Sequence, residues 1–306
     1  MQETAPSRTA LTTSLIRAHH ARTSLAPLIN DPWGDVLVPQ SFVDVLLQWA
    51  SQDETHSVIA GERQAVLDGY LSRAASYASV IFRSRFAEDA LDAAIAKGVR
   101  QYVQIGAGFD SYVLRRPPHA RDVQVFEVDH PATQTLKLQR LSELDVSPPV
   151  CAEFIAADLA RESIVDALRR SGFQFDKPAF FSWLGVTMYL TREANLATLR
   201  AIAGCCKPES SVVFTYTDEL GLLPGSQSAA YERMKRNVAA LGEPFLSGFD
   251  PQQLSAILAG VGFVLKEDLS GLDLSERYAC SAAPPLLPSA FSRIALAVVN
   301  PTTVPS

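Results

Sequence analysis

From Gly98 onward, short apolar runs rich in β-branched and aromatic residues alternate with segments of helical spacing, and this alternation constrains the fold most. The expected strands are QYVQIG, VQVFEVD, EFIAAD, AFFSWLG and SVVFTYTD, and the helical segments between them include PATQTLKLQRLSELD, ARESIVDALRRSG and TREANLATLRAIAGC. Such alternation is typical of βαβ units, which build a mostly parallel sheet with helices on both faces. The sequence therefore predicts an α/β, doubly wound fold for residues 98–306.

The remaining segments predict helices around this sheet. Residues 1–97 show helical spacing and are expected to form a helical region, and a helical insert is expected at about 220–248, where the alternation is interrupted. After the insert, GFDPQQLSAILAGVGF predicts a helix with Asp250 as N-cap and Pro251 at its first position. The runs VLKEDLS and AFSRIALAVVN predict two more strands. We expect all of these parts to form one integrated unit.

Composition and charge argue against several classes of protein. The net charge of −6 over 306 residues disfavours a nucleic-acid-binding protein, which needs a basic face. No apolar run approaches the roughly 20 residues of a membrane helix, and the first residues, MQETAPSRTALTTSLIRAHHARTS, lack the pattern of a secretory signal. The five histidines show no spacing typical of a zinc site. The four cysteines show no CxxC spacing, so we expect reduced thiols and a cytoplasmic location; they are Cys151, Cys205, Cys206 and Cys280.

The segment QYVQIGAGFDSYVLRR contains a candidate nucleotide-binding turn. The first predicted strand ends at Ile105, so Gly106 and Gly108 lie at the carboxyl edge of the sheet, where open α/β sheets bind ligands. Glycine at both positions allows a tight turn and a close approach of ligand to backbone. Two glycines alone are a weak signal, because many such turns contain them.

Acids at the ends of the next two strands strengthen this interpretation. Asp129 follows Gly108 by 21 residues, the position from which an acid accepts hydrogen bonds from ribose hydroxyls, and Glu127 lies on the same face of the strand. Asp158 ends the third strand, where a carboxylate can accept a hydrogen bond from the adenine amino group. Both aspartates could instead cap the helices that follow them.

The residues after the glycines distinguish between two kinds of nucleotide. A dinucleotide site needs a third glycine, where this chain has Ser111, and a pyrophosphate at the helix N-terminus, where Asp110 places a negative charge. S-adenosylmethionine has no phosphate, and its sulfonium and ammonium groups tolerate a nearby carboxylate. The sequence therefore favours S-adenosylmethionine over a nicotinamide dinucleotide.

Several motifs together resemble a known family. RSRFAEDAL, QYVQIGAGFDS, VFEVDHPATQTLK, AADL and FFSWLGVTMYLT occur in order, with LINDPWGDVLV near the start and FDPQQL near the end. They resemble the leucine carboxyl methyltransferase family, and more closely its bacterial branch of S-adenosylmethionine-dependent O-methyltransferases. The resemblance covers about Arg8 to Val299 and implies a Rossmann-like class I methyltransferase fold. It also implies the cofactor contacts: Gly106, Gly108 and Asp110 in the turn, Asp129 on the ribose, Asp158 and Leu159 on adenine, and Arg83 on the methionine carboxylate, with Arg85 as the rival.

One residue departs from the family pattern. Some members have a glutamate just before the position of Gly185, where this chain has Leu184. Tyr189, near the end of the fourth strand region, is the candidate for positioning the acceptor. His130 is expected to be structural, and His19 and His20 receive no predicted role.

The acceptor is predicted to be a small molecule methylated on a carboxylate or a hydroxyl. No histidine–acid pair is evident in the predicted site, which mildly favours an acceptor that needs no general base. The helical N-terminal region and the insert are expected to build the acceptor pocket, made partly aromatic by Trp33, Trp49, Phe245 and Phe249. The alternatives are a catalytically idle S-adenosylmethionine-binding protein and an NAD(P)-dependent oxidoreductase.

Overall fold

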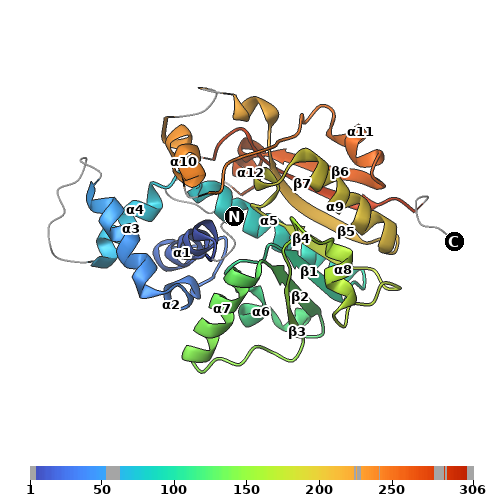
Figure 1. The fold of residues 1–306 in the computed structure, drawn as a ribbon, viewed down its shortest axis with the longest axis horizontal. Coiled ribbons are helices and arrows are strands. Elements are labelled where there is room, and N and C mark those ends of the chain that lie inside the picture. Colours follow the sequence, from blue (N-terminus) through green and yellow to red (C-terminus); the bar gives the residue numbers. More distant parts are fainter. Residues whose placement is uncertain are drawn as a thin grey trace.

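A single seven-stranded sheet forms the centre of the molecule (Figure 1). The structure is a computed structural model that describes residues 5–52, 63–223, 225, 229–240, 242–278, 286 and 288–301. The strand order is β3-β2-β1-β4-β5-β7-β6. The strands are β1 Gln101–Ile105, β2 Gln124–Asp129, β3 Ala152–Ala156, β4 Phe180–Trp183, β5 Ser211–Thr217, β6 Phe263–Ser270 and β7 Ser292–Val299.

Strands β1 to β5 run parallel, whereas β7 pairs antiparallel with both β5 and β6. The predicted mostly parallel sheet is therefore confirmed, including the two late strands. The strand order reverses at β1, because β2 and β3 extend to one side of it and β4 and β5 to the other. Ligands of open α/β sheets bind beyond the carboxyl ends of the strands at such a reversal.

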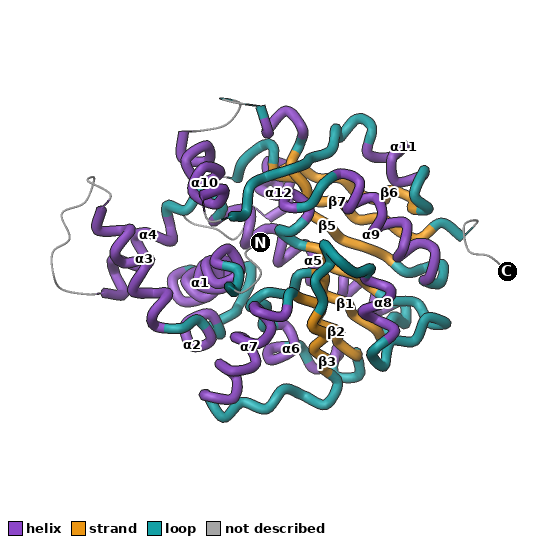
Figure 2. Tube along the Cα trace, viewed as in Figure 1, coloured by secondary structure: helices purple, strands orange, loops and turns teal. Residues whose placement is uncertain are grey.

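Helices cover both faces of the sheet, as the doubly wound prediction requires (Figure 2). Val103 and Ile105 pack in one apolar cluster with α8, α9 and α11, whereas Tyr102 packs in another with α5, α6 and α12. This alternation follows from the two-residue period of a strand. The helices are α5 Tyr77–Ala96, α6 Tyr112–Arg115, α7 Pro131–Glu143, α8 Ile164–Arg169, α9 Arg192–Cys205, α11 Leu254–Ala259 and α12 Gly271–Tyr278, and a short 3-10 helix, η1, spans Pro118–Ala120.

The N-terminal region is helical, as its spacing predicts, and α1 packs against α5 (Figure 1). The side chain of Ser7 caps α1 by accepting a hydrogen bond from Ala10 N at 3.1 Å. A third apolar cluster joins this region to Phe109 beside the glycine turn and to Leu141 of α7. The helices of this region are α1 Arg8–Thr23, α2 Gly34–Leu37, α3 Gln40–Gln52 and α4 Arg63–Ser72.

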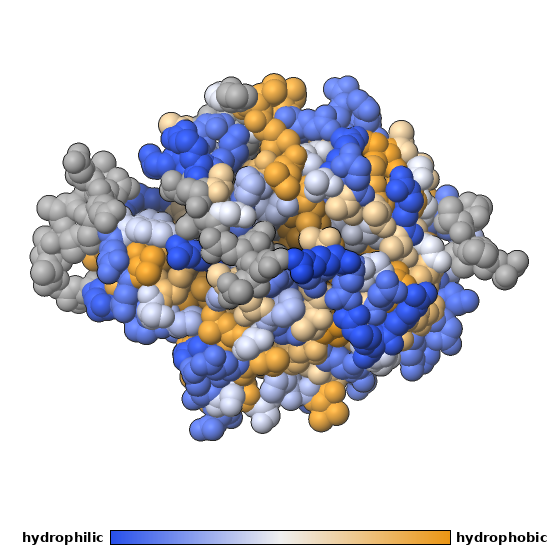
Figure 3. All heavy atoms as spheres, in the orientation of Figure 1, coloured by the Kyte–Doolittle hydropathy of each residue, from blue (hydrophilic) through white to orange (hydrophobic). Residues whose placement is uncertain are grey.

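The late insert contains η3 Glu219–Leu222 and α10 Ala229–Ala240. Leu220 and Leu223 are 61% and 55% exposed. Figure 3 shows hydrophobic residues gathered near the top of the face in view, where Figure 1 draws the short gold helix of η3. The insert therefore presents apolar side chains to solvent.

The predicted start of the helix after the insert is wrong. Asp250 accepts a hydrogen bond from Gln252 N at 2.9 Å, so it closes a turn, and α11 begins at Leu254 with Gln253 as its N-cap. The aspartate side chain satisfies the turn before the helix starts, which delays the helix past Pro251. The sequence also gave no indication of α12.

The remaining general expectations concern membranes and thiols. None of the helices in the described ranges combines the length and the apolar character needed to span a bilayer. Cys151, Cys205 and Cys206 are free thiols, and Cys280 lies outside the described residues.

Candidate active site

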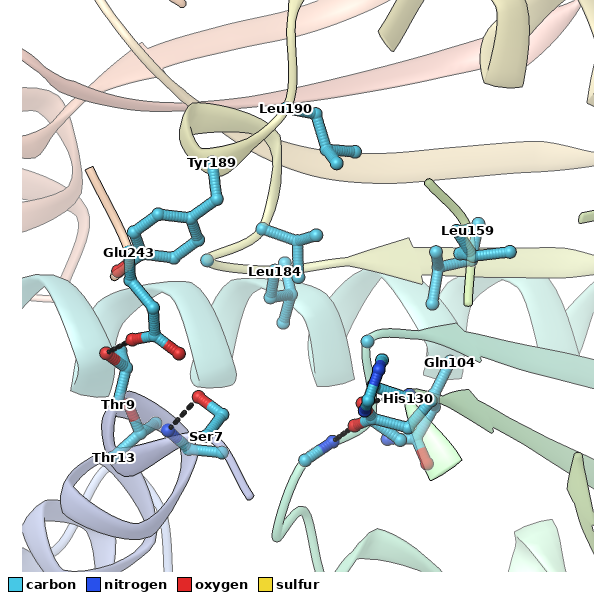
Figure 4. A pocket seen from close by; sticks show the side chains of 18 of the residues that line it. Ser7, Thr9, Thr13, Gln104, His130, Leu159, Leu184, Tyr189, Leu190 and Glu243 are labelled. Atoms are coloured by element: carbon cyan, nitrogen blue, oxygen red, sulfur yellow. Dashed lines mark hydrogen bonds between the residues drawn. The ribbon is translucent and has the colours of Figure 1, made fainter. Parts of the chain in front are cut away.

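A cavity of about 520 Å³ lies at the carboxyl ends of the central strands. It is lined by residues at or just beyond the ends of β1, β2, β3 and β4, by one side of α1, and by residues 242–244 and 246 of the late insert (Figure 4). The cavity therefore lies where the strand order reverses, and parts of the chain far apart in sequence meet there.

The turn after β1 has the conformation that its glycines predict. Gly106 and Gly108 have φ of +69° and +56°, in the left-handed region that favours glycine. A Cβ on Gly106 would lie 2.4 Å from Val186 Cγ2, and one on Gly108 would lie 2.9 Å from Ala10 Cβ. Gly106 N donates to the Val128 carbonyl at 2.8 Å, which fixes the turn to β2. Both glycines are thus required by conformation and by space.

Asp129 connects the end of β2 to this turn. Its carboxylate accepts hydrogen bonds from Gly108 N and, at 2.5 Å, from His130 N. Burial raises the pKa of Asp129, and the two backbone N–H groups oppose that shift. His130 Nδ1 accepts from Ala132 N at 3.3 Å and caps α7, the structural role expected for it, and it also lines the cavity.

Asp110 supplies a fixed negative charge beside the turn. Burial alone would raise its pKa, but the charges of Arg17, Arg115 and Lys137, together with a hydrogen bond from Gln104, outweigh burial and lower the pKa of Asp110 to about 2. Each arginine has another carboxylate partner: Arg17 lies 2.7 Å from Asp31, and Arg115 lies 2.5 Å from Glu88. Within the described ranges no lysine, arginine or histidine forms an ion pair with Asp110, so its carboxylate places a negative charge beside the turn at neutral pH.

Asp158 and Leu159 line the cavity just beyond β3. Asp158 Oδ1 accepts a hydrogen bond from Ala160 N at 3.0 Å, and its Oδ2 lies 3.3 Å from Arg161 Nε. The alternative role of Asp158 as a helix cap is wrong, because α8 begins at Ile164 with Ser163 as its N-cap. Asp158 closes a turn instead.

The structure separates the two candidate arginines. Arg83 is half-buried on α5, lines the cavity, and lies so close to Gly185 that a Cβ there would be 2.7 Å from Arg83 Nη1. Within the described ranges no carboxylate forms an ion pair with Arg83, and burial lowers its pKa to about 10. The Arg85 side chain is 44% exposed and pairs with Asp89 at 2.5 Å. Arg83 is therefore the one of the two that can bind an anion in the cavity.

Tyr189 and Leu184 also line the cavity. Tyr189 ends η2 Thr187–Tyr189, beyond β4, and Figure 4 shows its ring beside Glu243. Burial raises the pKa of Tyr189 to about 12, and the charge of Glu243 acts in the same direction. The phenol is therefore protonated at neutral pH. Leu184 gives the cavity an apolar side chain at the position where some relatives are expected to have an acid.

Glu127 does not line the cavity, contrary to the expected cofactor contact. Its side chain is 1% exposed and forms an ion pair with Lys137 of α7, which also donates to the Asp110 carbonyl at 2.5 Å. Burial raises the pKa of Glu127 to about 7, although Lys137 opposes the shift. The lysine ammonium therefore holds this carboxylate inside the protein, away from any ligand.

The predicted aromatic lining is also wrong, because none of its four residues lines the cavity. Phe249, for example, is buried against Phe214 and Tyr216. The four residues are Trp33, Trp49, Phe245 and Phe249.

The unassigned histidines have structural roles in the N-terminal region. His19 Nδ1 lies 3.0 Å from Asp68 Oδ1, and His20 Nδ1 lies 3.1 Å from the Tyr77 hydroxyl. His20 Nε2 accepts a hydrogen bond from Leu28 N at 3.1 Å. Both rings are buried, so these contacts explain them without a ligand.

The sequence did not reveal several polar residues of the cavity, among them Thr9, Arg17 and Glu243. Thr9 Oγ1 donates to Glu243 Oε2 at 2.5 Å across a separation of 234 residues. Neither residue belongs to a motif, so no local signal could have found the pair.

The fold and the cavity together define a Rossmann-like nucleotide-binding protein. The features that define it are the strand order, the antiparallel β7, the glycine turn, and the acids at the ends of β2 and β3. Solved structures agree on the fold. A provisionally named methyltransferase from Thermobifida fusca YX aligns with a TM-score of 0.53 at 17% identity, over 94% of each chain. A DUF574 family protein from Streptomyces avermitilis MA-4680 aligns with a TM-score of 0.52 at 16% identity, over 83% of this chain and 95% of that one.

Sequence comparison gives the family. The model of the family described as leucine carboxyl methyltransferase matches residues 10–203. YktD of Bacillus subtilis (strain 168), provisionally named an S-adenosyl-L-methionine-dependent methyltransferase, is 32% identical over 285 residues, which cover 91% of this chain and 93% of that protein. A protein of Mycobacterium tuberculosis (strain H37Rv) with the same provisional name is 33% identical over 201 residues, 65% of this chain and 63% of its own length. The chain belongs to the leucine carboxyl methyltransferase family, which confirms the resemblance of its motifs.

Proposed function

We propose that the chain is an S-adenosyl-L-methionine-dependent O-methyltransferase that acts on a carboxylate or a hydroxyl of a small molecule. Family membership and the provisional names of the relatives support the cofactor and the methyl transfer. The observation that carries the proposal is the cavity itself, because it combines a half-buried arginine that has no carboxylate partner in the described ranges with acids after two adjacent strands.

The residues present fit this cofactor. The carboxylates of Asp129 and Asp158 would accept hydrogen bonds from the ribose hydroxyls and the adenine amino group. Arg83 would bind the methionine carboxylate, since a guanidinium forms strong charge-assisted hydrogen bonds with carboxylates. Backbone at Gly106 and Gly108 would approach the ligand closely, because neither has a side chain.

The electrostatics support this cofactor over a dinucleotide. When bound, S-adenosylmethionine supplies a methyl group on a positively charged sulfur. The negative charge of Asp110 attracts such a cation and repels a pyrophosphate, and it persists at neutral pH because the pKa of Asp110 is about 2. This favours a methyltransferase over an oxidoreductase.

The chain would promote the reaction mainly by positioning. The acceptor oxygen must lie about 3 Å from the methyl carbon in an orientation that allows in-line attack, and water must be excluded. Leu184 and Leu190 give the cavity apolar surface, and Leu246, which is 54% exposed, extends that surface outward. These side chains suit an acceptor with an apolar body. The proposed reaction involves no nucleic acid, membrane or metal ion.

Methyl-labelled cofactor tests the proposal. The protein should transfer label from S-adenosylmethionine to members of a mixed panel of aromatic acids and phenols. Treatment of the product with alkali then distinguishes esters, which lose the label, from ethers, which keep it. Asp129→Asn should abolish labelling, whereas Asp122→Asn, at an exposed position outside the cavity, should not change it. A protein that binds the cofactor but labels no member of the panel would instead fit the idle binding protein.

A further inference from the structure

Three residues from distant segments form a polar cluster at one end of the cavity. Thr9 lies on α1, Tyr189 on η2 and Glu243 in the late insert. Thr9 Oγ1 donates to Glu243 Oε2 at 2.5 Å, and the Tyr189 ring lies beside Glu243 (Figure 4). Figure 4 shows this cluster on the side of the cavity opposite His130 and Leu159. It therefore lies away from the end assigned to adenine and ribose.

Glu243 differs from the three aspartates of the cavity, because each aspartate accepts a hydrogen bond from a backbone N–H and Glu243 accepts none from the described residues. It is only 8% exposed, yet no lysine, arginine or histidine of the described ranges forms an ion pair with it. Its Oε1 accepts no hydrogen bond from any residue that the structure describes. The free oxygen of Glu243 is thus available to a ligand in the cavity.

Tyr189 cannot serve as the base of this cluster. Its pKa is raised to about 12 by burial and by the charge of Glu243, so the phenol keeps its proton at neutral pH. It can donate a hydrogen bond to an acceptor oxygen and position that oxygen. Among the other acids of the cavity, Asp129 and Asp158 are assigned to the cofactor, and Asp110 lies in the glycine turn.

We propose that Glu243 is the general base for a hydroxyl acceptor, a phenol or an alcohol, and that it excludes carboxylate acceptors. This inference rests on the proposed function and narrows it to the formation of methyl ethers. The acceptor hydroxyl gives its proton to Glu243 Oε1 while its oxygen bonds to the methyl carbon. The electron pair of the broken carbon–sulfur bond stays on sulfur, so atoms and charge balance.

The same geometry disfavours a carboxylate acceptor. Its charge would lie beside that of Glu243 in a site of low exposure, where like charges repel strongly. A neutral hydroxyl instead satisfies the open oxygen of Glu243 and gains a hydrogen bond from the Tyr189 phenol. The position of Glu243, where the insert contacts α1, also agrees with the expectation that these two segments build the acceptor pocket.

The test compares two acceptors of the same shape. 2-Naphthol and 2-naphthoate are titrated calorimetrically into the S-adenosylhomocysteine complex of the wild-type protein, of Glu243→Gln and of Glu276→Gln. Glu276 is exposed on α12 and does not line the cavity, so its variant is a matched control for loss of one charge. The wild type and the control should bind naphthol at least about tenfold more tightly than naphthoate, whereas Glu243→Gln should tighten naphthoate binding and largely remove this preference. Methyl transfer to naphthol should fall about 100-fold or more in Glu243→Gln, the usual scale of general-base catalysis.

A second variant covers the case in which Glu243→Gln does not fold. Thr9→Val removes the donor that orients Glu243, and it should reduce the preference for naphthol. Thr12→Val is its control, because the Thr12 hydroxyl donates to the Arg8 carbonyl of its own helix at 3.0 Å and Thr12 does not line the cavity.

Three results would overturn the inference. The first is a wild-type complex that binds naphthoate as tightly as naphthol, or that does not bind naphthol at all. The second is an unchanged preference in Glu243→Gln. The third is an S-adenosylhomocysteine affinity that falls tenfold in Glu243→Gln with acceptor preference unchanged, which would assign the carboxylate to the methionine ammonium. Failure of the proposed function is distinct, since the wild-type protein would then not bind S-adenosylhomocysteine.

Discussion

Replacing Arg83 with methionine should make the protein more stable while weakening its affinity for the cofactor. Burial lowers the pKa of Arg83 from 12.5 to about 10, and one pKa unit corresponds to about 1.4 kcal/mol. Below both values the arginine is charged in the folded and unfolded states, so the charge costs the folded state up to about 3 kcal/mol at neutral pH. Methionine keeps the apolar stem and removes the charge. We therefore expect the free energy of unfolding to rise by about 1–3 kcal/mol.

The same substitution should remove the contact to the methionine carboxylate. Hydrogen bonds to charged groups contribute about 1.5–3 kcal/mol, so the dissociation constant of S-adenosylhomocysteine should rise about 10- to 100-fold. Thermal unfolding without ligand and calorimetric titration with S-adenosylhomocysteine measure the two effects separately. For a chain of 306 residues the gain in stability corresponds to a rise in Tm of about 2–5 °C.

Arg85→Met is the matched control for this substitution. Arg85 lies two residues away on the same helix but is exposed and paired with Asp89. An exposed ion pair contributes about 0–1 kcal/mol, so this variant should keep its cofactor affinity and nearly its Tm. If Arg83→Met lowered Tm and bound S-adenosylhomocysteine like the wild type, Arg83 would be a structural residue and the assignment of the methionine end would be wrong.

Three further substitutions test other parts of the account. Gly106→Ala should lower the free energy of unfolding measured in urea by more than about 2 kcal/mol, because φ is +69° and the new methyl group meets Val186; Val186→Ala in the same chain should restore part of the loss. Asp158→Ala should weaken S-adenosylhomocysteine binding by about 1–3 kcal/mol, measured by calorimetry, with little change in Tm. Burial, followed by the charge of His19, lowers the pKa of His20 from 6.5 to about 4. The folded state therefore binds fewer protons than the unfolded state between these values, so stability should fall as the pH is lowered through this window, and less so in His20→Gln.

The fold could be predicted from the sequence because its signals are local. Strands buried on both faces read as apolar runs, and the segments between them have helical spacing. The errors arose where a side chain competed with the regular pattern. Asp250 closes a turn and delays α11, and α12 follows directly on the half-buried end of β6, where the apolar pattern is weak.

The site could be predicted only where topology fixes it. Asp129 is the last residue of a parallel strand, and Gly106 and Asp158 follow two others. The carboxyl ends of such strands meet at one edge of the sheet. The prediction that Glu127 contacts the cofactor is wrong because Lys137, on the next helix, forms an ion pair with its carboxylate inside the protein.

Residues brought to the cavity by tertiary packing could not be predicted in this way. Arg83 and Arg85 point in different directions because residues two apart on a helix differ by about 200°, and the sequence alone does not give the helix phase. The resemblance to the family favoured Arg83, and of the two arginines Arg83 is the one that lines the cavity. Thr9 and Glu243 meet only through the packing of α1 against the insert, so no local pattern reveals them.

The assignment of this cavity to S-adenosylmethionine is tested most directly by calorimetry. The purified protein is titrated in parallel with S-adenosylmethionine, S-adenosylhomocysteine and NADH. We expect the first two to bind and NADH not to bind, and we expect Asp129→Ala to stay folded but to lose its affinity for both. Binding of NADH alone, or unchanged affinity in Asp129→Ala, would contradict the assignment of this cavity to S-adenosylmethionine.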